Sequence, residues 1–387
     1  MNALAPLPSG SWLGVLGGGQ LGRMFCQAAQ ALGYRVAVLD PAPDGPAARV
    51  ADQHLQAAYD DRAALEQLAR RCVALTTEFE NVPADSLQYL VRTRVTAPSA
   101  RAVAIAQDRI QEKTWFQAAG VAVAAHAAIG SDADLSSCSP ALFPGILKTS
   151  RLGYDGKGQV HVQDAAAGRA AFAQLQRVPC ILEALQPLDH EISVIVVRGR
   201  NGQAVAYPAI RNRHRDGILA VSLCDGSVPA DLAAEAGRLA MQVARHLDYH
   251  GVLCIEFFVL EGGRLLANEM APRPHNSGHL TQDACLVSQF EHQARVLAGL
   301  PLGDTGLLCP AAMVNLLGDL WQGTEGEPVE PDWAAVLQVP GTRLHLYGKD
   351  APRVGRKMGH VNILAPTAAS LHERVAQVMG VLGLPHA

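Results

Sequence analysis

The sequence predicts an α/β protein of two or three domains whose first domain is a doubly wound parallel sheet. The chain has 387 residues, and a domain usually takes about 100–200. Near the N-terminus, apolar runs alternate with helix-like segments, as in βαβ units. Hydrophobic residues make up 49% of the chain and charged residues 18%. Such a chain can bury substantial cores.

The N-terminal segment is interpreted as strand, glycine turn, helix and strand. Residues 12–16 and 35–39 are apolar runs, and Gly17-Gly-Gly-Gln-Leu-Gly22 opens a helical stretch between them. Glycine turns between such runs are typical of a βαβ unit. Further alternation through 72–76 and 95–98 predicts one domain over residues 1–106.

The rest of the chain mixes strands and helices. A helix is expected over 107–119 because Gly120 would end it. The Ser-, Asp- and Pro-rich stretch 131–144 predicts a loop, and 145–148 predicts a strand that ends in Lys148. A strong helix is expected at 231–247. Beyond about residue 310 the chain is rich in strand and turn residues and ends in a helix near 370–382.

Composition excludes several functional classes. The net charge of −4 provides no general basic surface for nucleic acid or a membrane. Residues 1–12 lack the basic start and apolar core of a secretory signal, and no run approaches the ~20 apolar residues of a membrane span. The eight cysteines lack metal-site spacing and are interpreted as reduced thiols, which favours a cytoplasmic protein.

The first glycine motif leaves three interpretations open. Gly17-x-Gly19-x-x-Gly22, followed by Asp40 at the end of the next strand, matches the dinucleotide-binding pattern. The same turn and helix N-terminus could hold a ribose phosphate. It could also be a tight turn that binds nothing.

The second half of the chain favours a nucleoside triphosphate. Lys148 and the glycine-rich loop 153–158 can wrap a polyphosphate with main-chain N–H groups and an ammonium. Glu183 and Glu191 flank Gln186-Pro187, where one carboxylate could accept from a base amine and another from ribose hydroxyls.

Two glutamates indicate a metal ion. Glu256 lies in an apolar strand, and Asn268-Glu269 ends the next strand after the Gly262-Gly263 turn. Paired carboxylates in apolar surroundings are costly unless a cation lies between them. Oxygen ligands suit Mg²⁺. The alternative is two surface glutamates on edge strands.

Longer strings resemble a known family. They run in the family's order along nearly the whole chain: Gly17-Gly-Gly-Gln-Leu-Gly-Arg-Met24, Thr77-Glu-Phe-Glu-Asn-Val-Pro83, Gln107-Asp-Arg109, Lys148-Thr149, Gly153-Tyr-Asp-Gly-Lys-Gly-Gln159, Asn268-Glu-Met-Ala-Pro-Arg-Pro-His-Asn-Ser-Gly-His279, Ser288-Gln-Phe-Glu291 and Gly355-Arg-Lys-Met-Gly-His360. With Glu256 they resemble the ATP-grasp fold. More narrowly, they resemble N5-carboxyaminoimidazole ribonucleotide synthase, the ATPase subunit of phosphoribosylaminoimidazole carboxylase.

This resemblance implies an architecture and a reaction. It implies a Rossmann-like pre-ATP-grasp domain at 1–106, an ATP-grasp domain at 107–308 with a mobile lid at about 120–186, and a small β-rich domain at 309–387. The implied reaction joins 5-aminoimidazole ribonucleotide and bicarbonate with ATP, through carboxyphosphate, to give N5-carboxyaminoimidazole ribonucleotide, ADP and phosphate in purine biosynthesis. The implied partners are these small molecules, with no nucleic acid or membrane, in a cytoplasmic homodimer.

The resemblance also assigns residues. Those expected at ATP are Arg109, Lys148, Gly153, Tyr154, Asp155, Gly156, Lys157, Gly158, Gln159, Glu183, Ala184, Leu185, Gln186, Glu191, His214, Asn268 and Glu269. Those expected at Mg²⁺ are Glu256 and Glu269. Those expected at the ribonucleotide are Gln20, Leu21, Glu78, Asn276, Lys349, Arg356 and Lys357. Those expected at bicarbonate and the transferred carboxyl are Tyr154, Asp155, Arg273 and His275.

Three other functions compete with this one. An NAD(P)-dependent oxidoreductase would use the first glycine motif but leaves Lys148 and the carboxylate pair unexplained. A related ATP-grasp formate-dependent glycinamide ribonucleotide transformylase shares most motifs, and the loop 153–159 argues against it. A non-catalytic nucleotide-binding module would not need intact phosphate and metal residues. Alternation along the strand does not separate Glu78 from Glu80 as the substrate residue.

Overall fold

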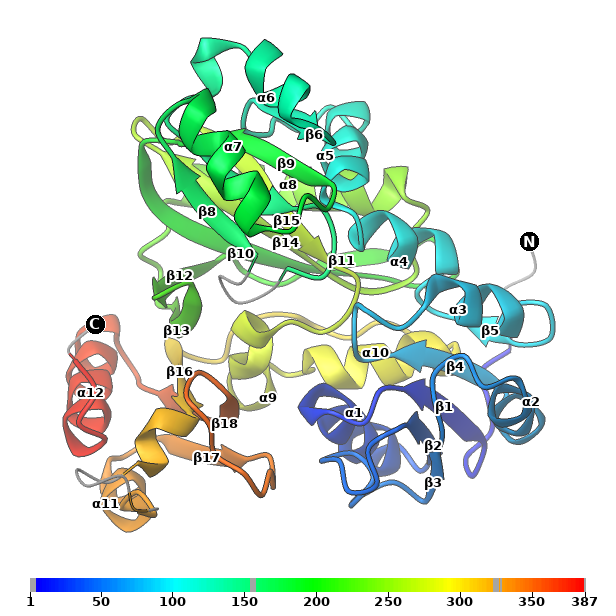
Figure 1. The fold of residues 1–387 in the computed structure, drawn as a ribbon. Coiled ribbons are helices and arrows are strands. Elements are labelled where there is room, and N and C mark those ends of the chain that lie inside the picture. The colour runs from blue at the N-terminus through cyan, green and yellow to red at the C-terminus, as the bar shows by residue number, and fades with distance from the viewer. Residues whose placement is uncertain (1–4, 154–157, 323–326, 328, 386–387) are drawn as a thin grey trace.

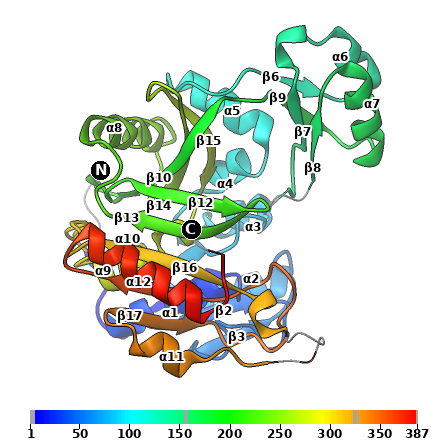
Figure 2. The ribbon, with the colours of Figure 1, turned by 90° about the vertical axis from the view of Figure 1, so that its left-hand side faces the viewer.

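The computed structural model describes residues 5–153, 158–322, 327 and 329–385, and three sheets organise them (Figures 1 and 2). The predicted α/β class with an N-terminal doubly wound sheet is confirmed. Among the described residues, no helix is both long and apolar enough to cross a bilayer.

The N-terminal sheet is parallel throughout, in the order β3-β2-β1-β4-β5. Its buried strands are continuous apolar runs, as expected of a parallel sheet with both faces covered. The strands are β1 (Trp12–Leu16), β2 (Arg35–Asp40), β3 (Gln53–Gln56), β4 (Ala74–Thr77) and β5 (Val95–Thr96). The helices are α1 (Gln20–Ala31), α2 (Arg62–Arg71), α3 (Ala84–Leu90) and α4 (Ala100–Ala106).

A four-stranded antiparallel sheet in the order β6-β9-β7-β8 stands apart at the upper right of Figure 2, with α6 and α7 beside it. The loop predicted over 131–144 is wrong, because α6 lies within it. Ser131 caps α6 by accepting from Asp134 N at 3.3 Å, and Leu135 is fully buried in the core. The elements are β6 (His126–Ile129), α6 (Asp132–Ser137), η1 (Pro140–Leu142), β7 (Gly145–Thr149), β8 (Gln159–Val162), α7 (Ala165–Gln174) and β9 (Cys180–Ala184).

The third sheet runs through the middle and C-terminal parts of the chain without a break. Its order is β15-β14-β10-β12-β13-β16-β18-β17, and β11 pairs with β10. The strands are β10 (Leu188–Arg198), β11 (Ala204–Ala206), β12 (Ile210–Arg215), β13 (Ile218–Cys224), β14 (Gly251–Leu260), β15 (Leu265–Ala271), β16 (Ala311–Leu317), β17 (Thr342–Leu346) and β18 (Lys357–Leu364). Because β13 pairs with β16, the C-terminal segment extends this sheet.

Helices join the N-terminal sheet to the third sheet. In particular, α10 packs on α1, and Gln293 on α10 donates to Thr76 Oγ1 on β4 at 3.0 Å. One core cluster accordingly contains both Val15 from β1 and Ile195 from β10. The remaining helices are α5 (Arg109–Ala118), α8 (Ala230–His246), η2 (Asn276–Leu280), α9 (Thr281–Ala284), α10 (Gln289–Ala298), η3 (Gly318–Trp321), α11 (Trp333–Gln338) and α12 (Ala368–Val381).

Candidate active site

The first glycine turn binds carboxylates of its own chain. Gly18 N donates to Asp40 Oδ2 at 2.6 Å, and Glu78 accepts from Gly19 N at 2.9 Å and Gly22 N at 3.1 Å. A Cβ at Gly17, whose φ is +114°, would lie 2.6 Å from Glu78 Cγ. The glycines therefore admit the buried Glu78 side chain.

This arrangement differs from the expected phosphate or dinucleotide turn. Three of the N–H groups that would bind an anion already have carboxylate acceptors, and an added phosphate would meet like charge. Asp40, which completes the dinucleotide-binding pattern, also accepts from Tyr59 Oη at 2.5 Å. The side chain of Leu21 packs with Tyr347 in a small core cluster. A ligand beside Gln20 and Leu21 would therefore meet the main chain of this turn.

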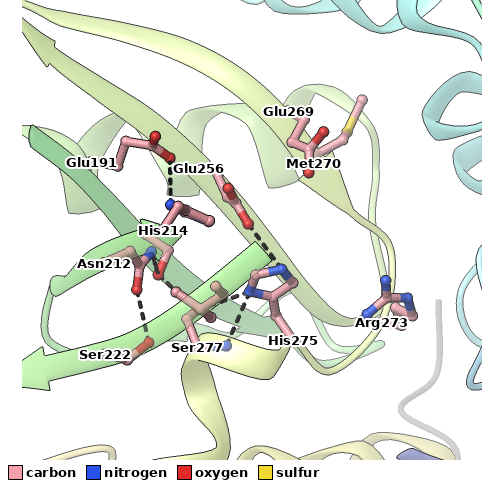
Figure 3. A network of polar contacts seen from close by, with 12 residues as sticks. Glu191, Asn212, His214, Ser222, Glu256, Glu269, Met270, Arg273, His275 and Ser277 are labelled. Carbon is pink, nitrogen blue, oxygen red and sulfur yellow. Dashed lines mark hydrogen bonds and ion pairs between the residues drawn. The ribbon is translucent and has the colours of Figure 1, made fainter. Parts of the chain in front are cut away.

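The predicted metal pair lies face to face on β14 and β15. Glu256 is directly opposite Glu269, although continuing the pairing of Phe257 with Ala267 by one residue would place Asn268 there. A bulge at Asn268 causes this shift, since one extra residue re-aims the side chains that follow. The two carboxylates thus lie on one face of the sheet (Figure 3).

The donor set around this pair suits Mg²⁺. Carboxylate oxygens are its usual protein ligands, and Asn268 adds a buried Oδ1 that has no hydrogen-bond partner within the described residues. The contacts found in this part of the chain use one oxygen of each glutamate. Arg109 Nη1 lies 3.1 Å from Glu269 Oε2, and His275 Nε2 lies 2.9 Å from Glu256 Oε1.

A buried polar relay holds His275 against Glu256. Ser277 contacts His275 Nδ1 through both Oγ, at 2.8 Å, and its main-chain N–H, at 3.3 Å. A main-chain N–H can only donate, so Nδ1 accepts, and the ring carries a proton on Nε2 that it donates to Glu256. The relay continues from Ser277 through Ser193 to Asn212. Figure 3 shows His275, Ser277 and Asn212 close together. His275 is therefore an orienting donor to Glu256.

Glu191 and His214 lie beside the metal pair on β10 and β12. His214 Nδ1 is 3.2 Å from Glu191 Oε2, and potential metal-ligand atoms of Glu191, His214 and Glu256 lie within 4.8 Å of one another. Burial, together with the charges of Glu256 and Glu269, raises the pKa of Glu191 to about 7. The apo site therefore carries an excess of negative charge that a bound cation would relieve.

The four-stranded sheet β6-β9-β7-β8 contributes Lys148 and Glu183 as a buried ion pair. Lys148 Nζ lies 3.1 Å from Glu183 Oε2, and Lys113 Nζ lies 3.6 Å from Glu183 Oε1. We expected the Glu183 carboxylate to read a base edge, but it is 4% exposed and enclosed by the two lysines. The following main chain is also engaged, since Ala184 N donates to Ala125 O and Leu185 N to Pro144 O, each at 2.9 Å. Gln186 Nε2 donates back to Ala184 O at 3.0 Å.

Part of the predicted phosphate loop can be described. Gly153 O accepts from Arg109 Nη2 at 3.3 Å, and Gly158 O accepts from Thr149 N at 2.8 Å. Gln159 begins β8 opposite Lys148. The other four predicted residues lie outside the described residues: Tyr154, Asp155, Gly156 and Lys157.

Glu78 and Glu80 have different partners. Glu78 binds the glycine turn, whereas Glu80 pairs with the half-buried guanidinium of Arg273. Burial alone would raise the pKa of Glu80, but Arg273 and more weakly Lys357 lower it. Arg273, expected at the transferred carboxyl, is therefore already held by a carboxylate.

The C-terminal basic residues lie on the loop before β18 and at the start of that strand. Lys349 Nζ donates to Lys357 O at 2.6 Å, and Arg356 Nη1 donates to Ala351 O at 2.7 Å. Lys357 also contributes to lowering the pKa of Glu256, although burial opposes this and His275 is the main cause. Asn276 is buried, and neither of its side-chain amide atoms has a hydrogen-bond partner within the described residues, so both can serve a ligand.

The sequence prediction missed two buried charges on α5. Glu112 and Lys113 are 2% and 0% exposed, and both contact the main chain of β15. Their spacing from Arg109 is i, i+3 and i+4, which places all three on one face of the helix. That spacing, in a helix that precedes the predicted phosphate-binding residue Lys148, was the available signal.

Comparison with known families agrees with this geometry. An ATP-grasp domain model matches residues 114–290, and a ribonucleotide synthetase preATP-grasp domain model matches 11–107. A phosphoribosylaminoimidazole carboxylase C-terminal domain model matches 311–374. The fold and the site thus define an ATP-grasp enzyme, an ATP-dependent ligase.

Individual relatives narrow the class. The chain is 43% identical over 363 residues to N5-carboxyaminoimidazole ribonucleotide synthase of Brucella melitensis, covering 93% of this chain and 98% of that one. An ADP complex of N5-carboxyaminoimidazole ribonucleotide synthetase is similar with a TM-score of 0.91 and 38% identity, over 98% and 99% of the two chains. The Aspergillus clavatus synthase in complex with ADP and 5-aminoimidazole ribonucleotide has a TM-score of 0.88 and 29% identity, over 97% and 99%. The chain belongs to the N5-carboxyaminoimidazole ribonucleotide synthase family.

Proposed function

We propose that this chain uses ATP to carboxylate the amine of 5-aminoimidazole ribonucleotide with bicarbonate, giving N5-carboxyaminoimidazole ribonucleotide, ADP and phosphate in purine biosynthesis. One observation carries the proposal. Glu256 and Glu269 face each other across the β14–β15 bulge, with Arg109 on one of them and the buried Lys148–Glu183 pair on the adjoining lid. Phosphoryl transfer needs this kind of charge neutralisation and positioning more than covalent help.

The residues divide into two groups. Arg109 and Lys148 would bind the ATP phosphates under the loop 153–159, with Glu191 and His214 on the ribose side and 183–186 along the base. Mg²⁺ on Glu256 and Glu269, beside Asn268, would offset the negative charge of the phosphates during transfer.

The chemistry has two balanced steps. A bicarbonate oxygen attacks the γ-phosphorus of ATP, and the bond to the β-phosphate oxygen breaks, which gives carboxyphosphate and ADP. The amine nitrogen then forms a bond to the carboxyl carbon, phosphate leaves, and the nitrogen loses a proton. Carboxyphosphate hydrolyses in bulk water, so the site must exclude water during both steps. Asp155, His275 and the released phosphate are the three candidates for the group that accepts the proton.

The ribonucleotide would lie between the first glycine turn and the basic loop. Glu78 and the main chain at Gln20 and Leu21 border one side, and Lys349, Arg356 and Lys357 border the other. Asn276 supports this position, because its buried amide has hydrogen-bonding capacity to spare. A cation cluster suits a 5′-phosphate. Arg273, steadied by Glu80, would face the transferred carboxyl with His275 beside it.

A phosphate-release assay tests the activity. With Mg-ATP, release should require both bicarbonate and 5-aminoimidazole ribonucleotide for full rate, and a carbamate should form. Replacing these with formate and glycinamide ribonucleotide tests the rival transformylase, which should give no product. The proposal would be overturned if the rate of phosphate release did not depend on the ribonucleotide and no carbamate formed.

We also propose that the enzyme works as a homodimer in the cytoplasm. The support for both is the family resemblance together with the sequence composition. Light scattering on the purified chain should give about twice the mass of 40.9 kDa, and a monomer at micromolar concentration would contradict the dimer.

A further inference from the structure

The bulge on β15 determines which way the Glu269 side chain points. Lys113, which has no role in the proposed reaction, contacts the main chain of this bulge. Regular pairing runs from Val259 opposite Leu265 to Phe257 opposite Ala267, and then shifts so that Glu256 faces Glu269. Without the shift, Glu269 would share a face with Ala267, which is buried in the core beside Phe257. A slip of one residue moves a side chain to the other face of a sheet.

Lys113 lies directly behind this bulge. Its Nζ donates to Asn268 O at 2.7 Å and lies 3.4 Å from Ala267 O. The neighbouring Glu112 accepts from Met270 N at 2.6 Å. Two consecutive α5 residues thus satisfy main-chain groups on both sides of Glu269. Buried main-chain carbonyls need such partners, and a bulge removes some of the ladder bonds that would supply them.

The same ammonium faces the lid. Lys113 Nζ lies 3.6 Å from Glu183 Oε1, and Glu183 Oε2 lies 3.1 Å from Lys148 Nζ. Lys113 is 0% exposed, so its charge acts through surroundings with little solvent screening. Within the described residues, Glu183 Oε1 has no hydrogen-bond partner, so the Lys113 ammonium at 3.6 Å acts on it as a nearby charge.

We propose that Lys113 is a positioning residue that fixes the bulge at Asn268, so that Glu269 faces Glu256, and that it links this pair to the lid lysine Lys148 through Glu183. The inference rests on the proposed function, because it takes Glu256 and Glu269 as the metal-binding pair. It adds a route, absent from the mechanism above, by which lid position and metal binding depend on one another.

Metal binding to the ADP complex tests the first part of this proposal. Lys113→Met removes the charge and keeps an unbranched side chain of similar length. Mn²⁺ replaces Mg²⁺, and electron paramagnetic resonance of free Mn²⁺ gives its dissociation constant. That constant should rise about tenfold or more, as when groups supporting metal ligands are lost. Phe116→Leu is the control, since Phe116 is equally buried on the same helix and packs in the apolar core. It should change the constant by less than twofold.

The link to the lid is tested by combining substitutions. Lys113→Met and Lys148→Met should each weaken ADP binding, and their effects should be less than additive because both act through Glu183. Full additivity would overturn the link. Two results would overturn the positioning role. One is a Mn²⁺ dissociation constant for Lys113→Met within twofold of that of the unchanged chain. The other is an equal rise of this constant in Phe116→Leu.

Folding is controlled by a second variant. Lys113→Met combined with Glu183→Gln removes the Lys113 ammonium together with the Glu183 carboxylate. This double variant therefore leaves no carboxylate without its Lys113 partner. If both variants fail to fold, Lys113 has a structural role only and the proposal is wrong. The proposed function fails differently: the unchanged chain would then bind Mn²⁺ and ADP without turning over 5-aminoimidazole ribonucleotide.

Discussion

Replacing Glu191 by Gln should stabilise the apo-protein above neutral pH and leave its stability unchanged in acid. The Glu191 side chain is 21% exposed and faces the charges of Glu256 and Glu269. Burial and these charges raise its pKa from 4.5 to about 7. At ~1.36 kcal/mol per pH unit, this rise corresponds to about 3 kcal/mol between the protonated and ionised forms.

The sign follows from proton counting. Below pH 4.5 the carboxyl is protonated in both the folded and the unfolded chain, so it contributes no pH dependence. Between pH 4.5 and about 7 the folded state keeps a proton that the unfolded state has lost, so the free energy of unfolding falls as pH rises. Above about pH 7 the full cost of about 3 kcal/mol is present. Glutamine has no such titration.

Urea denaturation of the metal-free chain at pH 5, 6, 7 and 8 measures this difference. The difference in free energy of unfolding between Glu191→Gln and the unchanged chain should grow as the pH rises from 5 and become constant near pH 8. Glu261→Gln, at an exposed turn carboxylate, serves as the control and should give no gap. If the free energies of unfolding of Glu191→Gln and the unchanged chain differed by the same amount at every pH, the electrostatic account of the site would be refuted.

Three further substitutions test other contacts. Glu78→Ala should lower the free energy of unfolding by about 2–4 kcal/mol, because two main-chain N–H groups lose their acceptor; an unchanged urea midpoint would contradict this. Lys148→Met should raise the KM for ATP about thirtyfold or more, since it removes the proposed phosphate ligand and leaves Glu183 partly unpaired. A KM within threefold in steady-state kinetics would argue against that role. Gly278→Ala should lower the thermal midpoint at a cost of about 1–3 kcal/mol, because a Cβ there would lie 2.1 Å from Ile195 Cδ1; calorimetry showing no change would show that this contact relaxes freely.

The sequence predicted the strands and helices whose formation depends on neighbouring residues in the chain. The apolar runs on either side of the first glycine turn predicted β1 and β2, and the apolar strand containing Glu256 predicted its burial. The helix within 131–144 was missed because polar N-terminal residues obscured a single buried anchor, Leu135. Composition alone favours a loop in such a segment.

The site departs from the prediction where contacts come from distant segments. Glu78 and Glu183 looked like free ligand carboxylates, but glycine N–H groups and Lys113 from elsewhere in the chain bind them. A regular hairpin would place Asn268 opposite Glu256, and the bulge that puts Glu269 there depends on α5. Patterns within one strand carry no information on such partners.

Oxygen-18 transfer tests the central claim most directly. The chain is supplied with Mg-ATP, 5-aminoimidazole ribonucleotide and freshly dissolved ¹⁸O-labelled bicarbonate, and the released phosphate is analysed by ³¹P NMR. Attack of bicarbonate on ATP predicts that one labelled oxygen passes into each phosphate, in step with carbamate formation. Phosphate without label, released at the same rate as product, would contradict a carboxyphosphate route and with it the proposed role of the site.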